Sequence, residues 1–301
     1  MQQSPVVIEA AINGVTDKRR NPHVPVTPEE IAADALACLE AGAAVVHNHI
    51  DRQTADGATI AARQLEGWRP IAAARPDAIL YPTIGFGGGA EARFGHIPIL
   101  AESGLMQMGV FDPGSVNLGG VDEDGVPGGP IDFIYANSFA DIRVAADLCE
   151  QHRLGPSIAI FEPGFLRATL AYHRAGRLPA GAFVKFYFGG DADYLGGRPR
   201  GVSFGLPPTA KALDAYLEML EGCDLPWAVA VVGGDVVATG MAERALERGG
   251  HLRVGLEDFA GPRHPTNEEL VREAVAVARR VGRPIASCRD ATEILRLPRQ
   301  T

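Results

Sequence analysis

The sequence predicts an α/β fold, a (β/α)8 or TIM barrel, formed as a single domain over residues 1–301 with a short extra C-terminal helix. Three observations lead to this prediction. Short apolar runs alternate with helical stretches eight times, the apolar runs are continuous, and no linker or change in composition divides the chain. Continuous apolar runs are typical of strands buried on both faces, and the intervening helices make neighbouring strands parallel. A doubly wound open sheet is the alternative fold.

The first repeat carries clear start and stop signals. An apolar strand is expected at residues 6–12, where it is followed by an Asn-Gly turn. Thr27 is expected to cap the first helix, with Pro28 at its first position and Glu30 completing a capping box. The helix is expected to end at Gly42, because glycine tolerates the left-handed conformation of a helix C-terminus.

The same unit recurs along the rest of the chain. Further strands are expected at residues 43–49, 78–83, 105–111, 157–162, 183–188, 227–232 and 251–256. Further barrel helices are expected at residues 58–74, 91–102, 138–153, 164–176, 208–222, 239–249 and 266–281, and an extra helix at 290–297. The carboxyl ends of barrel strands meet at one rim, so the polar residues that follow the strands predict an active site there.

Composition limits the possible classes of function. A net charge of −9 makes nucleic-acid binding unfavourable, and no apolar run approaches the ~20 residues that a membrane span needs. The N-terminus lacks the basic start and long apolar stretch of a secretory signal. The four cysteines form no CxxC pair, which is typical of reduced thiols. We therefore expect a cytoplasmic protein without nucleic-acid or membrane partners.

The sharpest local signal is the pair His47 and His49 at the end of the second expected strand. Side chains two residues apart in a strand point the same way, about 6–7 Å apart, so both imidazoles could bind one metal ion. Glu257, at the end of the last expected strand, is the preferred third ligand, and Asp51 is the second choice. Two nitrogens and one carboxylate leave a position open, as in catalytic zinc sites.

A second signal surrounds the proposed carboxylate ligand. Arg253 lies four residues before Glu257, and Asp258 follows it directly. An Asp–Arg pair beside a metal-bound carbonyl suits proton abstraction from carbon, because the metal takes up the enolate charge. The alternative for Arg253 is a buried charge paired with a barrel carboxylate.

Several longer stretches occur together and in a characteristic order. They are AAING (10–14), PVTPEE (25–30), AGAAVVHNH (41–49), PTIG (82–85), PGSVNLG (113–119), GGHLRVGLED (249–258), TNEELV (266–271) and GRPIA (282–286). On these stretches the chain resembles the β-keto acid cleavage enzyme family over nearly its whole length. The resemblance implies a zinc-dependent (β/α)8 barrel and a homotetramer. The activity it implies takes a β-keto acid and acetyl-CoA to acetoacetate and a new acyl-CoA by Claisen-type exchange, without a covalent enzyme intermediate.

Carried over by position, the resemblance makes His47, His49 and Glu257 the Zn²⁺ ligands. Arg253 and Asp258 match the catalytic pair that generates the carbanion.

The resemblance also supplies two hydroxyl groups that would stabilise developing oxyanions. Thr83 matches the hydroxyl residue at the third strand end, and Ser115 matches the one at the fourth, where the family uses Thr.

One position departs from the family pattern. The resemblance places Thr16 where the family has a glutamate that completes the acid/base relay. Either the relay lacks this carboxylate here, or Glu9 or Glu162 replaces it. Because that glutamate lies near the far end of the substrate, a 3-keto-5-amino substrate is not implied. Asn13, Thr16 and Glu162 are the expected substrate contacts.

Other basic residues carry weaker signals. Residues 18–20 (Lys-Arg-Arg), and Arg198 with Arg200, belong to loops at the same rim and are candidates to contact CoA phosphates, or are solvated loop charges. Lys185 suits an ion pair better than a Schiff base beside a metal site. The alternatives for function are another metal-dependent carbon–carbon lyase or hydrolase, and a non-catalytic barrel that binds a keto acid.

Overall fold

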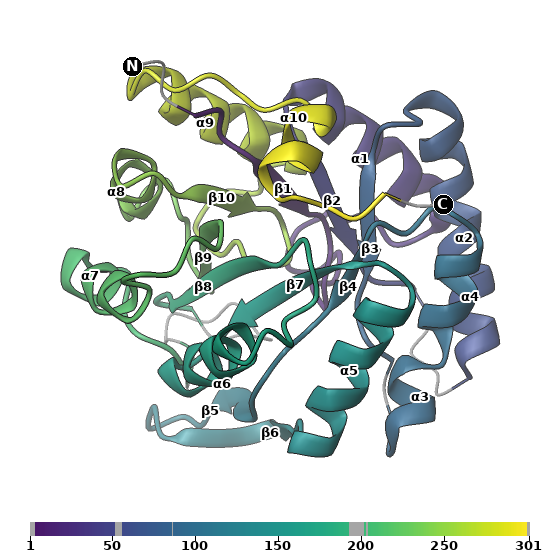
Figure 1. Cartoon of the computed structure of the whole chain (residues 1–301). Helices are drawn as coiled ribbons and strands as arrows, with labels where there is room; N and C mark the ends of the chain where they lie inside the picture. Colours follow the sequence, from purple (N-terminus) through teal and green to yellow (C-terminus); the bar gives the residue numbers. More distant parts are fainter. Residues whose placement is uncertain (1–3, 52–55, 86, 193–201, 203, 300–301) are drawn as a thin grey trace.

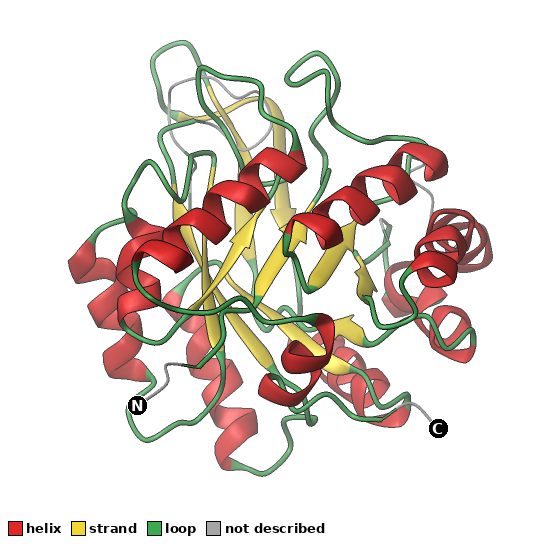
Figure 2. Cartoon of the chain, turned by 90° about the horizontal axis from the view of Figure 1, so that it is seen from above, coloured by secondary structure: helices red, strands yellow, loops and turns green. Residues whose placement is uncertain are grey.

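A computed structural model describes residues 4–51, 56–85, 87–192, 202 and 204–299. In these residues eight parallel strands, in the order β3-β2-β1-β10-β9-β8-β7-β4, form one sheet that curls into a barrel with helices around it (Figures 1 and 2). The strands are β1 (Ile8–Ala11), β2 (Val45–Asn48), β3 (Ile79–Pro82), β4 (Met108–Val110), β7 (Gly155–Ile160), β8 (Phe183–Gly189), β9 (Trp227–Val232) and β10 (His251–Val254). The predicted (β/α)8 barrel is confirmed.

The sheet closes between its two end strands. The backbone N–H of Gln107, next to β4, donates to the carbonyl of Leu80 on β3 at 3.1 Å. The amide side chain of Gln107 accepts from the N–H of Leu80 at 2.9 Å. These two hydrogen bonds connect β3 to the start of β4, where the barrel closes with few backbone hydrogen bonds between the strands.

Helices cover the outside of the barrel. They are α1 (Pro28–Ala41), α2 (Gly57–Ala74), α3 (Ala90–Phe94), α4 (His96–Glu102), α5 (Phe139–Gln151), α6 (Pro163–Arg174), α7 (Ala210–Met219), α8 (Met241–Glu247), α9 (Asn267–Arg280) and α10 (Cys288–Ile294). The predicted signals around α1 are present: Thr27 and Glu30 form a capping box, and Gly42 ends the helix with φ 122°. In the described residues no helix is both long enough and apolar enough to cross a membrane.

Most helices differ from their predicted extents by one to three residues at an end, and two of the differences have a clear physical reason. The helix expected at 91–102 is divided into α3 and α4 at Gly95, where the first turn of α2 packs so closely that a Cβ on Gly57 would lie 2.6 Å from the Gly95 backbone. The extra C-terminal helix begins at Cys288, two residues earlier than predicted, because Ser287 and Asp290 form a capping box there.

A hairpin interrupts the predicted alternation after β4. Strands β5 (Val116–Val121) and β6 (Pro127–Tyr135) pair antiparallel in a sheet separate from the barrel. No strand is predicted from the sequence here, because the glycines of this stretch obscure the apolar pattern of a strand. The hairpin matters for function, since it contributes Leu118, Ile134 and Tyr135 to the wall of the main cavity.

Candidate active site

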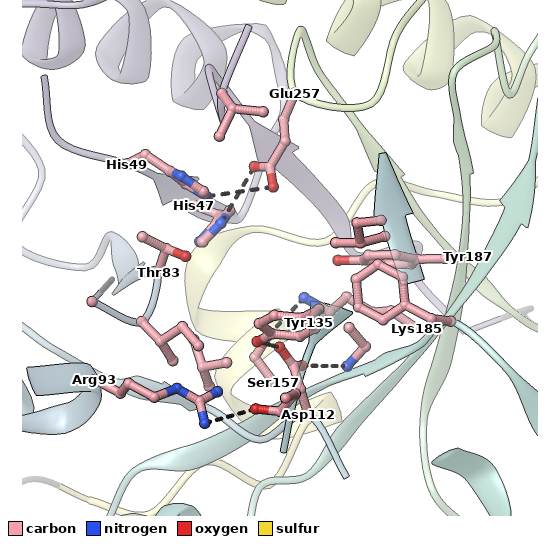
Figure 3. Close-up of a pocket in the computed structure, with 18 of the residues that line it drawn as sticks. His47, His49, Thr83, Arg93, Asp112, Tyr135, Ser157, Lys185, Tyr187 and Glu257 are labelled. Carbon is pink, nitrogen blue, oxygen red and sulfur yellow. Dashed lines mark hydrogen bonds and ion pairs between the residues drawn. The ribbon is translucent and has the colours of Figure 1, made fainter. Parts of the chain in front are cut away.

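The structure brings the three expected metal ligands together at the rim of the barrel (Figure 3). The Nε2 atom of His47 lies 3.3 Å from one carboxylate oxygen of Glu257, and Nε2 of His49 lies 3.5 Å from the other. One potential ligand atom from each residue lies within 4.8 Å of the others. The second-choice ligand Asp51 instead pairs with Arg63.

Neighbouring strands fix these positions. Strand β1 lies between β2 and β10 in the sheet. The histidines lie at the end of β2 and the glutamate follows β10, so the three side chains meet at the same end of neighbouring strands. The side chain of Asn13, just after β1, accepts from the N–H of His49 at 2.8 Å and donates to its carbonyl at 3.1 Å. Gly14 has φ +56°, and a Cβ there would lie 2.3 Å from Cγ of Glu257, so the close approach of this side chain requires glycine.

The chemistry of the donor set fits a divalent cation. Nδ1 of His47 contacts the carbonyl of Tyr81 at 3.3 Å, which leaves Nε2 toward Glu257. Nδ1 of His49 and Oε2 of Glu257 are buried without a hydrogen-bond partner among the described residues. Burial lowers the pKa of His47 to about 4, which keeps its imidazole neutral. Burial opposes ionisation of Glu257, but the charge of Arg253 holds its pKa well below the usual value. Neutral imidazoles and an ionised carboxylate are the forms that bind metal.

Arg253 connects the carboxylates of the site. Its Nε and Nη2 atoms donate to the two oxygens of Asp258 at 2.8 and 3.2 Å, and Nη2 lies 3.1 Å from Glu257. Its Nη1 donates to Glu9 at 2.7 Å. Burial raises the pKa of Asp258 even though Arg253 opposes the shift. The guanidinium therefore holds Asp258 in a fixed orientation while its carboxylate keeps an increased affinity for a proton.

A second buried cation lies on the far side of Glu9. The ammonium of Lys185 donates to Tyr81 Oη at 2.6 Å, to Ser157 Oγ at 2.6 Å and to Glu9 at 3.1 Å. The Tyr81 hydroxyl in turn donates to Glu9 at 2.5 Å. Burial raises the pKa of Glu9, but Lys185 and Arg253 outweigh it and lower the pKa to about 2. These contacts support an ion-pair role for Lys185 over a Schiff base.

A cavity of about 620 Å³ opens beside the three potential ligands. Thr83, Arg253 and Asp258 line it, as do Arg93, Asp112 and Asp141 from the opposite side. Much of the remaining wall is apolar and consists of Val15, Ile84, Val110, Leu118, Ile134, Ala159, Phe161, Tyr187 and Val232. The three potential metal ligands, His47, His49 and Glu257, thus face a cavity that is large enough for a small organic acid.

Four predicted site residues are not among the described residues that line the cavity. Asn13 holds the His49 backbone, and the Thr16 hydroxyl donates to the carbonyl of Leu256 at 2.8 Å. The Ser115 hydroxyl lies at the base of the hairpin and makes two hydrogen bonds to the backbone of Asn137. It donates to the Asn137 carbonyl at 3.1 Å and accepts from the Asn137 N–H at 2.9 Å.

The fourth, Glu162, accepts from the N–H of Gly205 at 2.9 Å. The direct substrate roles expected for these four residues stay predictions. Arg198 and Arg200 lie outside the described residues, whereas Lys18 and Arg19 form ion pairs with Glu30 and Asp17.

Asp112 and Tyr135 are among the cavity-lining residues that the sequence did not predict as site residues. Asp112 directly follows the expected strand at residues 105–111, and Tyr135 belongs to strand β6, which was not predicted. The Tyr135 hydroxyl donates to Asp112 at 2.6 Å. The sequence therefore held a usable signal for Asp112, because polar residues at the carboxyl ends of barrel strands face the rim where the site is expected.

The family model and the curated relatives that match this chain indicate the same protein family. The family model described as beta-keto acid cleavage enzyme matches residues 5–297. The 3-oxoadipate:acetyl-CoA acetyltransferase of Cupriavidus necator is 29% identical over 98% of this chain and 95% of its own length. The 3-keto-5-aminohexanoate cleavage enzyme of Fusobacterium nucleatum is 28% identical over 97% of this chain and 98% of its own.

Solved structures agree at the level of the fold. The apo structure of ObcA superposes with a TM-score of 0.68 at 18% identity, over 92% of this chain. This chain spans 66% of the length of that protein, so the similarity concerns the shared barrel alone.

Proposed function

This chain belongs to the beta-keto acid cleavage enzyme family, and from that premise we propose that it is a zinc-dependent acyltransferase. Its substrates would be a β-keto acid and acetyl-CoA, and its products acetoacetate and a new acyl-CoA. The curated relatives carry names of this kind, among them 3-oxoadipate:acetyl-CoA acetyltransferase and 3-dehydrocarnitine:acetyl-CoA trimethylamine transferase. The observation that carries the proposal is the convergence of His47, His49 and Glu257 beside the Arg253–Asp258 pair.

The three ligands would hold the zinc ion through the nitrogens and oxygens that face one another. When bound, zinc supplies Lewis-acid stabilisation of negative charge on substrate oxygens. The carbonyl of Tyr81 contributes by orienting the His47 imidazole, and Asn13 contributes by holding the backbone of His49.

Asp258 is the base in this proposal. It would take a proton from the carbon between the two carbonyl groups of the β-keto acid, and the raised pKa favours that transfer. The new carbanion bonds to the acetyl carbon of acetyl-CoA, and the C–S bond of that thioester breaks, so that CoA leaves as its thiolate. The CoA sulfur then adds to the former keto carbon. The bond between that carbon and the former carbanion then breaks, and the proton returns from Asp258 to the carbon released in acetoacetate. Arg253 holds the aspartate in place through both of its oxygens.

The buried charges favour an anionic substrate. Three carboxylates, Glu9, Glu257 and Asp258, surround the two cations Arg253 and Lys185. A divalent cation changes this net negative charge to a single positive charge, and one substrate carboxylate then neutralises the cluster. Unpaired charge is costly in a buried site, so the balance supports binding of a β-keto acid as its monoanion.

A labelling experiment tests the function. Zinc-loaded protein is incubated with a panel of β-keto acids and acetyl-CoA carrying ¹³C in its acetyl group. We expect labelled acetoacetate and an equal amount of new acyl-CoA. Cleavage that does not need acetyl-CoA would indicate a lyase or hydrolase, and metal and ligand binding without turnover would indicate a keto-acid-binding protein.

The Asp258→Asn variant tests the assigned base. Its kcat should fall about 10²- to 10⁴-fold because the proton acceptor is lost, while bound zinc stays stoichiometric. Asp235→Asn is the matched control, since Asp235 follows β9 at the same rim but pairs with Arg263 at 3.1 Å. Turnover of Asp258→Asn near that of the wild type would remove Asp258 from this role.

A further inference from the structure

Three of the described residues that line the cavity are tyrosines, and their hydroxyl groups differ in what they contact. The Tyr81 hydroxyl donates to Glu9 at 2.5 Å, and the Tyr135 hydroxyl donates to Asp112 at 2.6 Å. The Tyr187 hydroxyl has no hydrogen-bond partner in the described part of the chain. Its proton is therefore available to a molecule bound in the cavity.

The ring of Tyr187 is held on two sides. The guanidinium carbon of Arg253 lies 5.1 Å from its centroid, and the ring of Phe161 packs edge-on with the two centroids 4.9 Å apart. Tyr187 lies two residues after Lys185 on β8, so both side chains point to the interior of the barrel. These contacts fix the direction of the side chain, which extends into the space between the three potential ligands and Tyr135 (Figure 3).

The hydroxyl of Tyr187 keeps its proton. Burial raises the pKa of Tyr187 well above its usual value, although the charge of Arg253 opposes the shift. The same guanidinium donates to the proposed base Asp258 at 2.8 Å. A neutral hydrogen-bond donor therefore lies beside the group that would form the carbanion.

The proposed reaction develops negative charge on two carbonyl oxygens in turn. The first is the acetyl oxygen, which becomes an oxyanion when the carbanion adds to acetyl-CoA. The second is the keto oxygen, which becomes an oxyanion when the CoA sulfur adds to the former keto carbon. A donor that is already aimed at such an oxygen lowers the barrier of its step.

The two hydroxyls expected for this purpose are not both available. The Thr83 hydroxyl has no partner within the residues that the structure describes, and Thr83 lines the cavity. The Ser115 hydroxyl, in contrast, donates its proton to the Asn137 carbonyl at 3.1 Å, and Ser115 is not among the described lining residues. One oxyanion is thus left without its expected donor, and Tyr187 has the free proton to replace it.

Thr83 and Tyr187 lie on different sides of the barrel. Thr83 directly follows β3, which pairs with β2 and its ligand His47. Tyr187 lies on β8, which is four strands from β2 in the sheet order and therefore across the barrel (Figure 3). A β-keto acid bound at the metal ligands would place its keto oxygen near Thr83 and leave the acetyl oxygen to Tyr187.

We propose that Tyr187 is a catalytic residue whose hydroxyl donates a hydrogen bond to the acetyl oxygen of acetyl-CoA as that oxygen becomes negative. The inference rests on the proposed function. In this step the electron pair of the carbanion forms the carbon–carbon bond, and the π pair of the acetyl C=O moves onto the oxygen that Tyr187 contacts. When the C=O re-forms, the C–S bond breaks and its pair leaves on the CoA thiolate. The proton of Tyr187 stays on the tyrosine throughout.

Removing the hydroxyl and replacing it by another donor tests this role. Zinc-loaded protein is assayed with acetyl-CoA and the β-keto acid of highest turnover in the labelling panel. Tyr187→Phe should lower kcat about 10²-fold and change KM for either substrate by less than about threefold, because the donor acts on the oxyanion and not on the bound substrates. Tyr187→4-aminophenylalanine, which restores an N–H donor on the same ring, should keep kcat within about tenfold of the wild type.

Tyr216→Phe is the matched control. The Tyr216 hydroxyl is also without a partner in the described chain, but its ring stacks on Phe186, which points to the other side of β8, with the centroids 4.6 Å apart. This variant should keep the wild-type kcat.

Three results would overturn the inference. The first is a folded, zinc-loaded Tyr187→Phe with kcat near the wild-type value. The second is a loss in that variant that appears in KM and not in kcat, which would make Tyr187 a binding residue. The third is a folded Tyr187→4-aminophenylalanine with kcat about 10²-fold below the wild type, and this result decides the question even if Tyr187→Phe does not fold.

Failure of the proposed function looks different in the same assay. Acetyl-CoA-dependent turnover that Tyr187→Phe retains rejects only the role of Tyr187. Absence of acetyl-CoA-dependent turnover by the wild type for every β-keto acid of the panel rejects the function and with it this role.

Discussion

The two sides of the cavity are built in different ways. On the side of β1, β2 and β10, charged groups are dense and each contacts a partner, with Arg253 touching three carboxylates. On the side of β4, β6 and β7, the wall is mainly apolar and aromatic, and Asp112 lacks an ion pair among the residues described.

This contrast indicates that the two sides of the cavity have different roles. A densely paired charge network holds reacting groups in fixed positions, which electrostatic catalysis requires. A mainly apolar and aromatic wall with few charged side chains tolerates variation in the shape of the ligand while those charges select its charge. We therefore assign the reaction to the first side and the choice of substrate to the second, and three variants test the comparison.

The largest effect is expected on the charged side, from His49→Ala. Loss of one of three ligands should remove stoichiometric zinc and lower turnover by at least about 10³-fold, because Lewis-acid stabilisation is lost. Metal content after dialysis, measured by inductively coupled plasma mass spectrometry, checks this directly. His173→Ala, on α6, is the control. Full zinc retention in His49→Ala would show that other residues bind the metal.

The next effect concerns Glu9, which joins the two buried cations. Glu9→Gln should reduce the free energy of unfolding by about 3–5 kcal/mol, because Arg253 and Lys185 lose a shared counter-charge. Urea unfolding at pH 7 measures the change. The double variant Glu9→Gln with Lys185→Met should lose less than the sum of the single variants, since the unpaired charge is removed. Additive losses would contradict this coupling.

The same residue predicts a pH dependence. Folding lowers the pKa of Glu9 from 4.5 to about 2, so its ionised form stabilises the protein above pH 4.5. That stabilisation is lost as the pH falls from 4.5 toward 2. The unfolding free energy of the Glu9→Gln variant should therefore change less than that of the wild type across this range, and parallel curves would argue against the shift.

The smallest effect is expected on the aromatic side, from Tyr135→Phe. The variant removes the 2.6 Å hydrogen bond to Asp112 but keeps the ring. Turnover of a short β-keto acid that does not reach Asp112 should change little. The value of kcat/KM for a β-keto acid whose tail contacts Asp112 should fall about three- to tenfold, because the carboxylate is held less firmly. Tyr172→Phe serves as the control. The ring centroids of Tyr172 and Phe111 lie 5.4 Å apart, and Tyr172 is not among the described residues that line the cavity. An equal loss for both substrates would place Tyr135 in the reaction itself.

Local sequence signals predicted the barrel and one pair of ligands well. The alternation of side chains along a strand put His47 and His49 on one side, and capping residues marked the start of α1. The hairpin that carries Tyr135 was missed, since its glycine-rich strands lack a clear apolar alternation. The partner of Asp112 therefore could not be predicted either.

The sequence alone determined what depends on near neighbours: the order of strands and helices, their caps and the strand ends that carry polar residues. It left Glu9 and Glu162 as equal candidates for the second carboxylate beside Arg253. Only the tertiary structure decided between them, because closure of the barrel pairs β1 with β10 and sets Glu9 directly opposite Arg253. Glu162 begins α6 instead and bonds to Gly205. Contacts between distant strands follow from the register of the closed sheet, which no local pattern encodes.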